Sequence, residues 1–368
     1  MASSKVYFTD LHTCQGSNLL QKMEKLLRKA GLDKMDLDGK MVAIKLHMGE
    51  PGNLAFVRPN FAAVLVRMIK EKGGRPFLTD CNTLYRGKRA NAVDHLNAAM
   101  ENGFNRIAVG CDVIIADGLW GNEQREIVIE KELCRTAKIG SAIADADVVI
   151  SLSHFKGHEL TGFGGALKNL GMGSGSRCGK MEMHASSHPT VNAKKCVGCG
   201  QCVKNCPEKA IVLNEKKRAV IDDDLCVGCG QCVAICRYGA PEVEMEGSSE
   251  IVNKKIAEYA YAVVDGKPSF HISLIVDVSP NCDCWPFNDV PIVPDIGIAA
   301  SKDPVALDMA CVSLVNEASV AKGSVLDVKG KKGDKFKAIH PNTDWMTGLD
   351  HAQRIGLGKK DYELVRLK

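Results

Sequence analysis

The sequence predicts an α/β protein with a mostly parallel sheet and helices on both of its faces, interrupted by an inserted cysteine-rich α+β module. Three observations lead to this prediction. Short apolar runs alternate with helical segments up to residue 152, a duplicated cysteine-rich stretch then breaks the pattern, and the alternation resumes after residue 250. We therefore expect an α/β domain built from residues 1–190 and 248–368, with an insert at residues 191–247.

The predicted strands are short runs rich in β-branched and other apolar residues. They are residues 5–9, 41–46, 76–79, 113–116, 126–129, 147–152, 270–278, 292–300 and 362–365. The run at 147–152, DVVISL, is apolar almost throughout, which is typical of a strand that is covered on both faces. Strands that alternate with helices in this way indicate a mostly parallel sheet.

The predicted helices carry apolar residues at the 3.6-residue period. They are residues 19–30, 59–72, 90–101, 136–144, 251–264, 304–314 and 345–354. Gly31 follows the first helix, and Asp303 with Pro304 gives a cap and a first helical residue to another. The glycine-rich residues 160–180 are expected to be a loop with one helical turn near 166–170, and the lysine-rich residues 322–335 an exposed loop.

Composition excludes several classes of protein. Hydrophobic residues make up 45% and charged residues 25% of the chain, which is typical of a folded globular protein and not of a disordered one. No apolar run is long enough to predict a membrane span, and the N-terminus shows no secretory signal, so we expect a cytoplasmic protein. A net charge of +4 and 5% aromatic residues predict no nucleic-acid partner.

Eight of the sixteen cysteines form two copies of one spacing, because the string CVGCGQCV occurs at 196–203 and again at 226–233. Both copies read C-x2-C-x2-C-x3-C. Pro207 completes the first copy, whereas Arg237 stands where the second proline is expected. The cysteines are Cys196, Cys199, Cys202 and Cys206, then Cys226, Cys229, Cys232 and Cys236. Four thiolates in each copy favour two [4Fe–4S] clusters over two zinc sites, and the fourth cysteine of each copy is expected to bind the other cluster.

This module resembles the bacterial-type two-cluster ferredoxins. The resemblance implies one cluster held by Cys196, Cys199, Cys202 and Cys236, and another held by Cys226, Cys229, Cys232 and Cys206. The rest of the chain resembles the Domain-of-Unknown-Function-362 family. That resemblance rests on KLHMGEPGN (45–53), TDCNTLYRGKRANAVDH (79–95), SHFKGHELTGFGGALKNLGMG (153–173), SPNCDCWP (279–286) and VPDIGIAASKDPVALD (293–308). It implies no particular reaction.

Polar residues follow four of the predicted strands at the point where each strand ends. They are His47, Asp80, His154, Lys156, His158, Cys282 and Cys284. Because parallel strands bring their carboxyl ends to one edge of a sheet, we expect these residues to surround one pocket and to be catalytic. A metal bound by Cys282 and Cys284 is an alternative, as is ordinary loop polarity. The glycine-rich residues 162–175 are a candidate anion cradle, with Lys168 and Arg177 as its charged partners.

Together these features predict an iron–sulfur oxidoreductase of anaerobic metabolism, which passes electrons through two [4Fe–4S] clusters to or from a site on the α/β domain. The expected partner is a redox protein or a small-molecule substrate. Two alternatives remain open at this point. One is a ferredoxin-type carrier or docking protein without its own substrate, and the other is a metal- or cluster-assembly factor.

Overall fold

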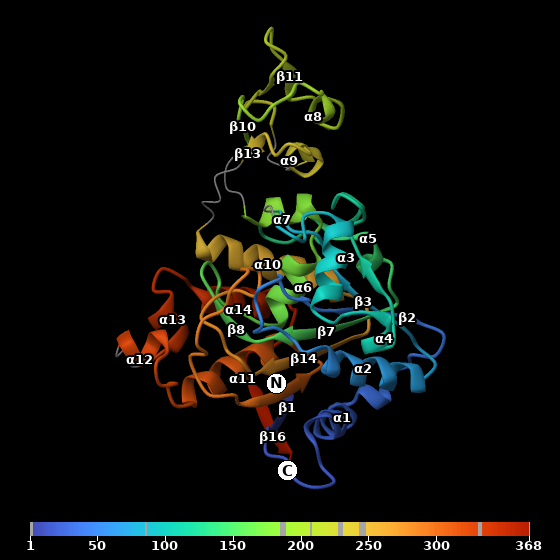
Figure 1. Ribbon diagram of the computed structural model, residues 1–368, viewed down its shortest axis with the longest axis vertical. Helices are drawn as coiled ribbons and strands as arrows, with labels where there is room; N and C mark the ends of the chain where they lie inside the picture. Colours follow the sequence, from blue (N-terminus) through green and yellow to red (C-terminus); the bar gives the residue numbers. More distant parts are fainter. Residues whose placement is uncertain are drawn as a thin grey trace.

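An eight-stranded sheet forms the centre of the protein (Figure 1). The computed structural model describes residues 3–84, 87–184, 189–206, 208–226, 231–242, 248–329 and 333–367. The sheet has the order β16-β1-β15-β14-β7-β2-β3-β4. Its strands are β1 (Ser4–Asp10), β2 (Met41–Lys45), β3 (Arg75–Asp80), β4 (Val113–Ile115), β7 (Val148–His154), β14 (Ser269–Ile275), β15 (Gly297–Ser301) and β16 (Tyr362–Leu367).

The sheet is mostly parallel, which confirms the predicted fold class. β15 runs antiparallel to both of its neighbours, β1 and β14. The other pairings in this sheet are parallel. Strands that precede the cysteine-rich segment and strands that follow it lie side by side, since β14 pairs with β7.

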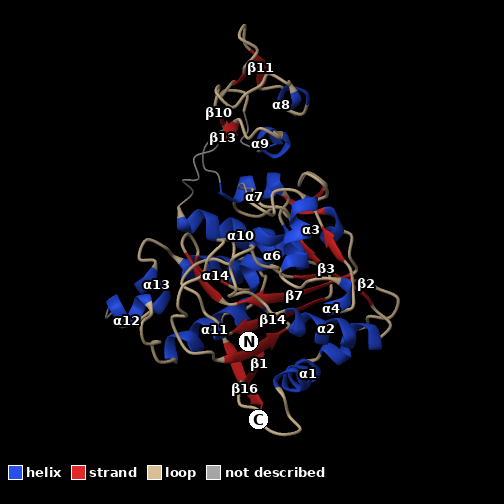
Figure 2. Cartoon of the chain, in the orientation of Figure 1, coloured by secondary structure: helices blue, strands red, loops and turns tan. Residues whose placement is uncertain are grey.

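Helices cover both faces of the sheet, and the strand residues alternate between the two cores as the pleat requires. Val42 and Ile44 of β2 pack in the core beneath α1 (Leu19–Ala30) and α2 (Pro59–Glu71), whereas Ala43 packs in the opposite core. Figure 2 shows α1 and α2 on one side of the sheet, and α6 (Ala166–Ser174) and α10 (Ser249–Val264) on the other.

Further helices complete the two layers. They are α3 (Ala92–Glu101), α4 (Arg106–Val109), α5 (Ser141–Ala144), α6 (Ala166–Ser174), α7 (Arg177–His184), α10 (Ser249–Val264), α11 (Pro304–Glu317), α12 (Val325–Lys329), α13 (Lys335–Ile339) and α14 (Trp345–Arg354). Asn18 caps α1 in a capping box, and Asp303 accepts the Val305 and Ala306 N–H groups at the start of α11. None of the described helices combines the length and the apolarity that a bilayer crossing demands.

Three local expectations were wrong. The residues predicted as a helix at 136–144 form strand β6 (Thr136–Gly140), which pairs with β5 (Gln124–Val128), and only the short helix α5 follows. The glycine-rich residues 160–180, predicted as a loop with one helical turn near 166–170, contain the longer helix α6 and the start of α7. The predicted loop at 322–335 includes helix α12.

The cysteine-rich insert has a small core of its own beside the main domain. Its elements are β10 (Thr190–Val191), α8 (Gln201–Lys204), β11 (Ile211–Leu213), β12 (Ala219–Ile221), α9 (Gln231–Ile235) and β13 (Pro241–Glu242). β10 pairs with β13 and β11 with β12, so each half of the insert meets the other. Figure 1 shows the insert next to α7, and α9 is the element that contacts α7.

Candidate functional site

The carboxyl ends of neighbouring parallel strands, together with the loop that follows β14, form one wall of a cavity of about 680 Å³. These strands are β14, β7, β2 and β3, in that order across the sheet. All seven residues predicted from the strand ends line this cavity, namely His47, Asp80, His154, Lys156, His158, Cys282 and Cys284. The structure therefore brings them together, and their catalytic role stays a prediction.

Asp283 is the buried centre of one ionic group in the cavity wall. It lies between Cys282 and Cys284 and is wholly buried. The Nδ1 atom of His154 lies 2.9 Å from Asp283 Oδ1, and Lys156 Nζ lies 3.0 Å from Oδ2. Burial opposes ionisation, but His154 and Lys156 outweigh it and lower the pKa of Asp283 to about 2. The other ring nitrogen of His154 contacts the Val276 carbonyl oxygen at 2.7 Å, so this ring is held in place at both nitrogens.

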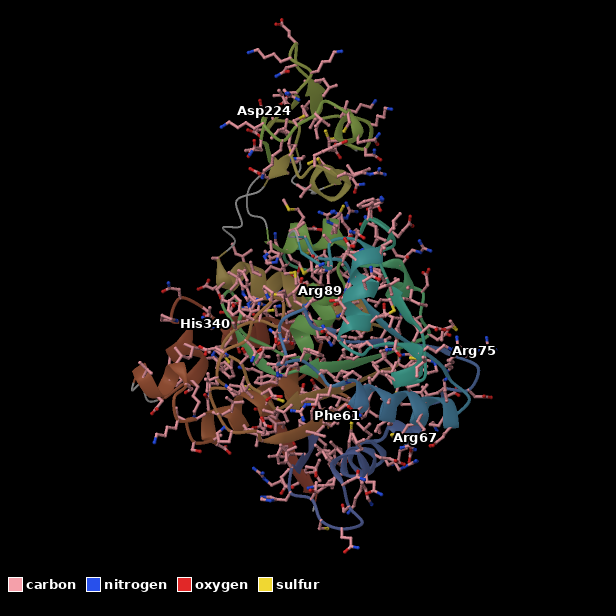
Figure 3. All side chains as sticks on the ribbon, viewed as in Figure 1. Phe61, Arg67, Arg75, Arg89, Asp224 and His340 are labelled. Carbon is pink, nitrogen blue, oxygen red and sulfur yellow. The ribbon has the colours of Figure 1, made fainter. Side chains whose placement is uncertain are left out.

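A second buried ionic group lies at the ends of β2 and β3. Lys45 Nζ is 2.9 Å from Asp80 Oδ1, and Arg89 donates to Glu50 Oε2 at 2.6 Å. Arg89 Nη1 also lies 3.9 Å from Asp80 Oδ2, which links the two pairs. Although burial raises the pKa of Asp80, the positive charge of Lys45 reverses the effect and holds that pKa below its ordinary value. Figure 3 labels Arg89 in the interior of the main domain.

Cys282 has the surroundings of a reactive thiolate. Its sulfur accepts the Cys284 N–H at 3.4 Å, lies 3.7 Å from Lys168 Nζ, and is hydrogen-bonded by the Cys284 thiol and the His158 ring. The Cys284 thiol, followed by Lys168 and His158, lowers the pKa of Cys282 well below its ordinary value despite burial. The pKa of Cys284 rises correspondingly, because its proton is shared with Cys282 and because the group is buried.

Two histidines of the cavity wall have one ring nitrogen fixed by the backbone. His158 Nδ1 accepts the N–H groups of Leu160 and Thr161, both at 3.1 Å, and His47 Nδ1 accepts the Gly49 N–H at 3.0 Å. In both neutral rings the proton is therefore on Nε2. Burial lowers the pKa of each ring, which keeps them neutral donors to the cavity.

The glycine-rich segment positions cavity residues without binding an anion at the start of α6. The N–H groups of Ala166 and Leu167 donate to the buried carboxylate of Asp308, at 2.7 and 2.9 Å. That carboxylate occupies the place of an anion, so the anion cradle expected within 162–175 is not formed at this helix end. Lys168, one of its two expected partners, faces Cys282 instead.

Sequence reasoning missed the buried Asp283, which lies behind the wall, and several charged residues of the wall itself, namely Lys45, Glu50, Arg89, Lys168 as a partner of Cys282, and Lys180. Lys45 is the last residue of β2, within the run 41–46 that the sequence predicts as a strand. Its position at a strand end was the available signal. Arg89 and Lys180 come from segments far along the chain, and no local pattern marks them.

Comparison with known proteins shows the family to which this chain belongs. A family model described as "Domain of unknown function (DUF362)" matches residues 42–313. The chain belongs to the DUF362 family. A search of curated proteins found no match for this DUF362 protein.

Two solved structures resemble parts of this DUF362 protein. One is the lactate racemase apoprotein from Thermoanaerobacterium thermosaccharolyticum, at 12% identity and a TM-score of 0.39, covering 74% of this chain and 51% of the other. Another is a protein from Thermotoga maritima, at 13% identity and a TM-score of 0.37, covering 69% and 50% respectively. The chain thus spans about half the length of each.

The cysteines of the insert in this DUF362 protein fit the ligand set expected for one cluster. Cys196, Cys199, Cys202 and Cys236 line one small cavity of the insert. The Ala219 and Ala240 N–H groups donate to the sulfurs of Cys196 and Cys236, both at 3.4 Å. Backbone N–H groups directed at cysteine sulfurs are a known means of tuning such clusters.

The second expected ligand set is described only in part, because Cys229 lies outside the described residues, as does Pro207. Among the described residues, no group of three His, Cys, Asp or Glu side chains is arranged to hold a single metal ion. This includes the neighbourhood of Cys282 and Cys284. A cubane cluster places each thiolate on a separate iron, so its four ligands need not converge on one point.

Arg237, the departure from the ferredoxin pattern, contacts the main domain. Its guanidinium group lies over the Trp120 ring, 4.9 Å from the ring centroid. Nearby, the Cys178 sulfur of α7 donates to Gln231 Oε1 of α9 at 2.8 Å. The residue that replaces proline is thus part of the contact between the insert and the α/β domain.

Proposed function

We propose that this DUF362 protein is an iron–sulfur oxidoreductase that passes electrons through two [4Fe–4S] clusters to or from a substrate in the cavity. The clusters, when bound, supply one-electron transfer. The residues of this chain that would hold them are the eight cysteines of the two C-x2-C-x2-C-x3-C motifs. A redox partner protein would exchange electrons at the insert, and a cytoplasmic location stays part of the proposal.

The observation that carries the proposal is the position of helix α7 between the insert and the cavity. Cys178 of α7 bonds to Gln231 of the insert, while Lys180 and His184 of the same helix line the cavity. One eight-residue helix therefore contacts both the insert and the substrate cavity. Electron transfer between a cluster and a bound substrate requires a short distance between the two.

The cavity itself favours an enzyme over a simple carrier. A carrier has no need of an internal space of about 680 Å³ whose wall contains two buried ionic groups and a stabilised thiolate. Buried charges are costly unless they are paired, so such groups are typical of sites that act on a ligand. Within the cavity the chain's own groups would bind and orient the substrate, with His47 as a fixed hydrogen-bond donor, while His158 donates to Cys282.

The first test is chemical analysis of protein purified without oxygen. Two cubane clusters require about eight iron and eight acid-labile sulfide per chain. Replacing Cys199 by Ser should lower both contents together. Protein that contains zinc and no labile sulfide would contradict the proposal.

The second test separates an enzyme from a carrier. Oxidation of reduced methyl viologen is measured in the presence of small carbonyl, carboxylic and disulfide compounds, which are the candidate electron acceptors. Turnover should be lost in Lys156→Met while the iron content remains, because Lys156 lies in the cavity wall and not in the insert. The control is Lys267→Met, since Lys267 bonds to backbone carbonyls of Ile143 and Ala144 away from the cavity. Equal turnover in all three proteins would indicate a carrier.

A further inference from the structure

The carboxylates of the cavity wall are already used by groups of the protein. Asp80 pairs with Lys45, Glu50 with Arg89, and Asp283 with Lys156 and His154. Glu159, at the more exposed side, accepts the Trp285 Nε1–H at 2.8 Å. These acids are therefore poor sites for a cationic ligand, which would have to displace a buried partner.

Donors, in contrast, remain available to a ligand. Among the described residues, His47 Nε2 is buried without a hydrogen-bond partner, and it carries the proton of its ring because Nδ1 accepts the Gly49 N–H. Lys180 Nζ donates to the Gly175 carbonyl oxygen at 2.6 Å, which uses one of its three hydrogens. Both residues line the cavity and both lie within electrostatic range of Asp80.

Positively charged side chains also outnumber carboxylates at the end of the cavity near Lys45 and Asp80. Among the described wall residues here, Lys45, Arg89 and Lys180 lie near the carboxylates of Asp80 and Glu50. Asp117 lies behind the wall, where Lys180 and Arg177 both act on its charge, so that with Arg177 included four cationic groups face three carboxylates. A buried positive charge without a counter-ion is costly, and an anionic ligand removes that cost.

We propose that the cavity binds a small organic anion, whose carboxylate group is held by Lys180 Nζ and His47 Nε2–H. Cys282 lines the same cavity, so its alkylation reports which small molecules enter that cavity. A volume of about 680 Å³ suits a small metabolite rather than a macromolecule. This inference names the substrate class for the proposed function and rests on that function's cavity, not on the clusters.

The test compares two thiol reagents of similar size, iodoacetate, which carries a carboxylate, and iodoacetamide, which is neutral. The anaerobically purified protein is treated with each reagent, and alkylation of Cys282 is followed by peptide mass spectrometry. Cys14 is the internal reference because it is exposed. The ratio of the iodoacetate rate to the iodoacetamide rate should be about tenfold higher at Cys282 than at Cys14, as one charge-assisted hydrogen bond predicts.

Two variants assign the effect to Lys180. Lys180→Met should bring the rate ratio at Cys282 down to that of Cys14, while iodoacetamide still reacts. Lys267→Met, which removes a partly buried lysine bonded to carbonyls elsewhere, should leave the ratio unchanged. A high ratio that persists in Lys180→Met would overturn the assignment, because Lys168 beside Cys282 would then be sufficient.

Other outcomes would overturn the proposal in different ways. Equal ratios at Cys282 and Cys14 in the unaltered protein would show that the cavity does not select anions. A Cys282 that reacts with neither reagent would show that the cavity does not admit small molecules. Alkylation needs no cluster chemistry, so protein that lacks iron yet keeps the preference for iodoacetate would contradict the proposed function and leave this inference standing.

Discussion

The Cys284 thiol donates to the Cys282 sulfur, so the two residues share one proton when Cys282 is a thiolate. The lower pKa belongs to Cys282, where Lys168, the Cys284 N–H and the His158 ring surround the sulfur. His158 is held as a neutral donor by the two backbone N–H groups on its Nδ1 atom. The ring therefore stabilises the thiolate by donation and is poorly suited to take a proton from it.

Replacing Cys284 by Ala should raise the pKa of Cys282, because the Cys284 thiol is the largest contributor to its lowering. The rate of Cys282 alkylation by iodoacetamide, measured against pH, should shift to higher pH. Cys284→Ser is the matched control, because a hydroxyl group still donates, and it should shift the profile less. Superimposable profiles for the three proteins would contradict this account.

Asp283 should be the most costly carboxylate of the cavity to remove. In Asp283→Asn, the buried Lys156 and His154 lose their counter-ion, which predicts a loss of about 3–5 kcal/mol in the free energy of unfolding. Urea unfolding followed by circular dichroism at pH 7 measures it. Asp145→Asn breaks the exposed pair with Arg125 and should cost less than about 1 kcal/mol.

The same variant has a defined pH dependence. The folded-state pKa of Asp283, about 2, lies below its ordinary value of 3.8. The carboxylate therefore stabilises the fold fully above about pH 4, and this stabilisation is lost as the pH falls toward 2. The difference between the unaltered protein and Asp283→Asn should shrink across that interval. A difference that stays constant would contradict the ion-pair explanation.

Which residues meet in the cavity was predictable from the sequence, whereas how they are paired was not. Parallel strands place their carboxyl ends on one edge, and that rule alone collects His47, Asp80 and Cys282. The partners Arg89 and Lys180 come from a loop and a helix whose positions depend on tertiary packing. The role of Asp283 was not predictable, because its partners His154 and Lys156 lie far away in the sequence.

Among the elements, α6 shows why glycine content misled the prediction for residues 160–180. Glycine is unfavourable in helix interiors, so a glycine-rich segment reads as a loop. Here the glycines allow close packing instead. A Cβ atom on Gly171 would lie 2.2 Å from the Ile256 carbonyl oxygen of α10. Tertiary contact between α6 and α10 thus overrides local propensity.

Gly171→Ala should therefore destabilise the protein by about 1–3 kcal/mol, despite the higher helix propensity of alanine. Its added methyl group meets backbone that cannot move without shifting α10. Gly348→Ala in α14 is the comparison, because there the Cβ would lie 3.1 Å from the Asn253 side chain on the same helix α10. Urea unfolding should show the larger loss for Gly171→Ala, and equal losses would contradict the packing argument.

At the scale of the whole molecule, the main sheet does not depend on the insert for its strands. β7 and β14, which precede and follow the insert, pair directly over Ser269 to Leu274. The alternation of strands and helices made this sheet predictable, because the same pattern continues in the sequence after the insert. The antiparallel direction of β15 was not predictable, since no residue pattern distinguishes it from a parallel strand that is buried on both faces.

Excising residues 192–247 and joining the ends by a short linker should leave a folded α/β domain that contains no iron. Far-ultraviolet circular dichroism and cooperative thermal unfolding measure the fold, and iron analysis measures the clusters. The physical reason is that the insert has its own small core, centred on Ile211 and Ala219. An excised protein that is unfolded or aggregated would show that the two parts fold as one unit.

The proposal that each half of the insert supplies one cysteine to the cluster of the other half gives a further prediction. Cys236 lines the cavity formed by Cys196, Cys199 and Cys202, so by the same rule Cys206 belongs to the other half. Cys206→Ser should therefore alter the electron paramagnetic resonance of the cluster that we propose at Cys226 and Cys232. Loss of signal only from the cluster of Cys196 would contradict the crossed arrangement.

The contact between Arg237 and Trp120 gives the molecule an internal optical probe. Trp120 belongs to the α/β domain, and the guanidinium group that covers its ring belongs to the insert. Indole emission depends on what lies against the ring, and iron–sulfur clusters absorb visible and near-ultraviolet light. If the insert moves away from α7 when a redox partner binds, the fluorescence of Trp120 changes with it, and the docking of the insert can be timed without attaching any dye.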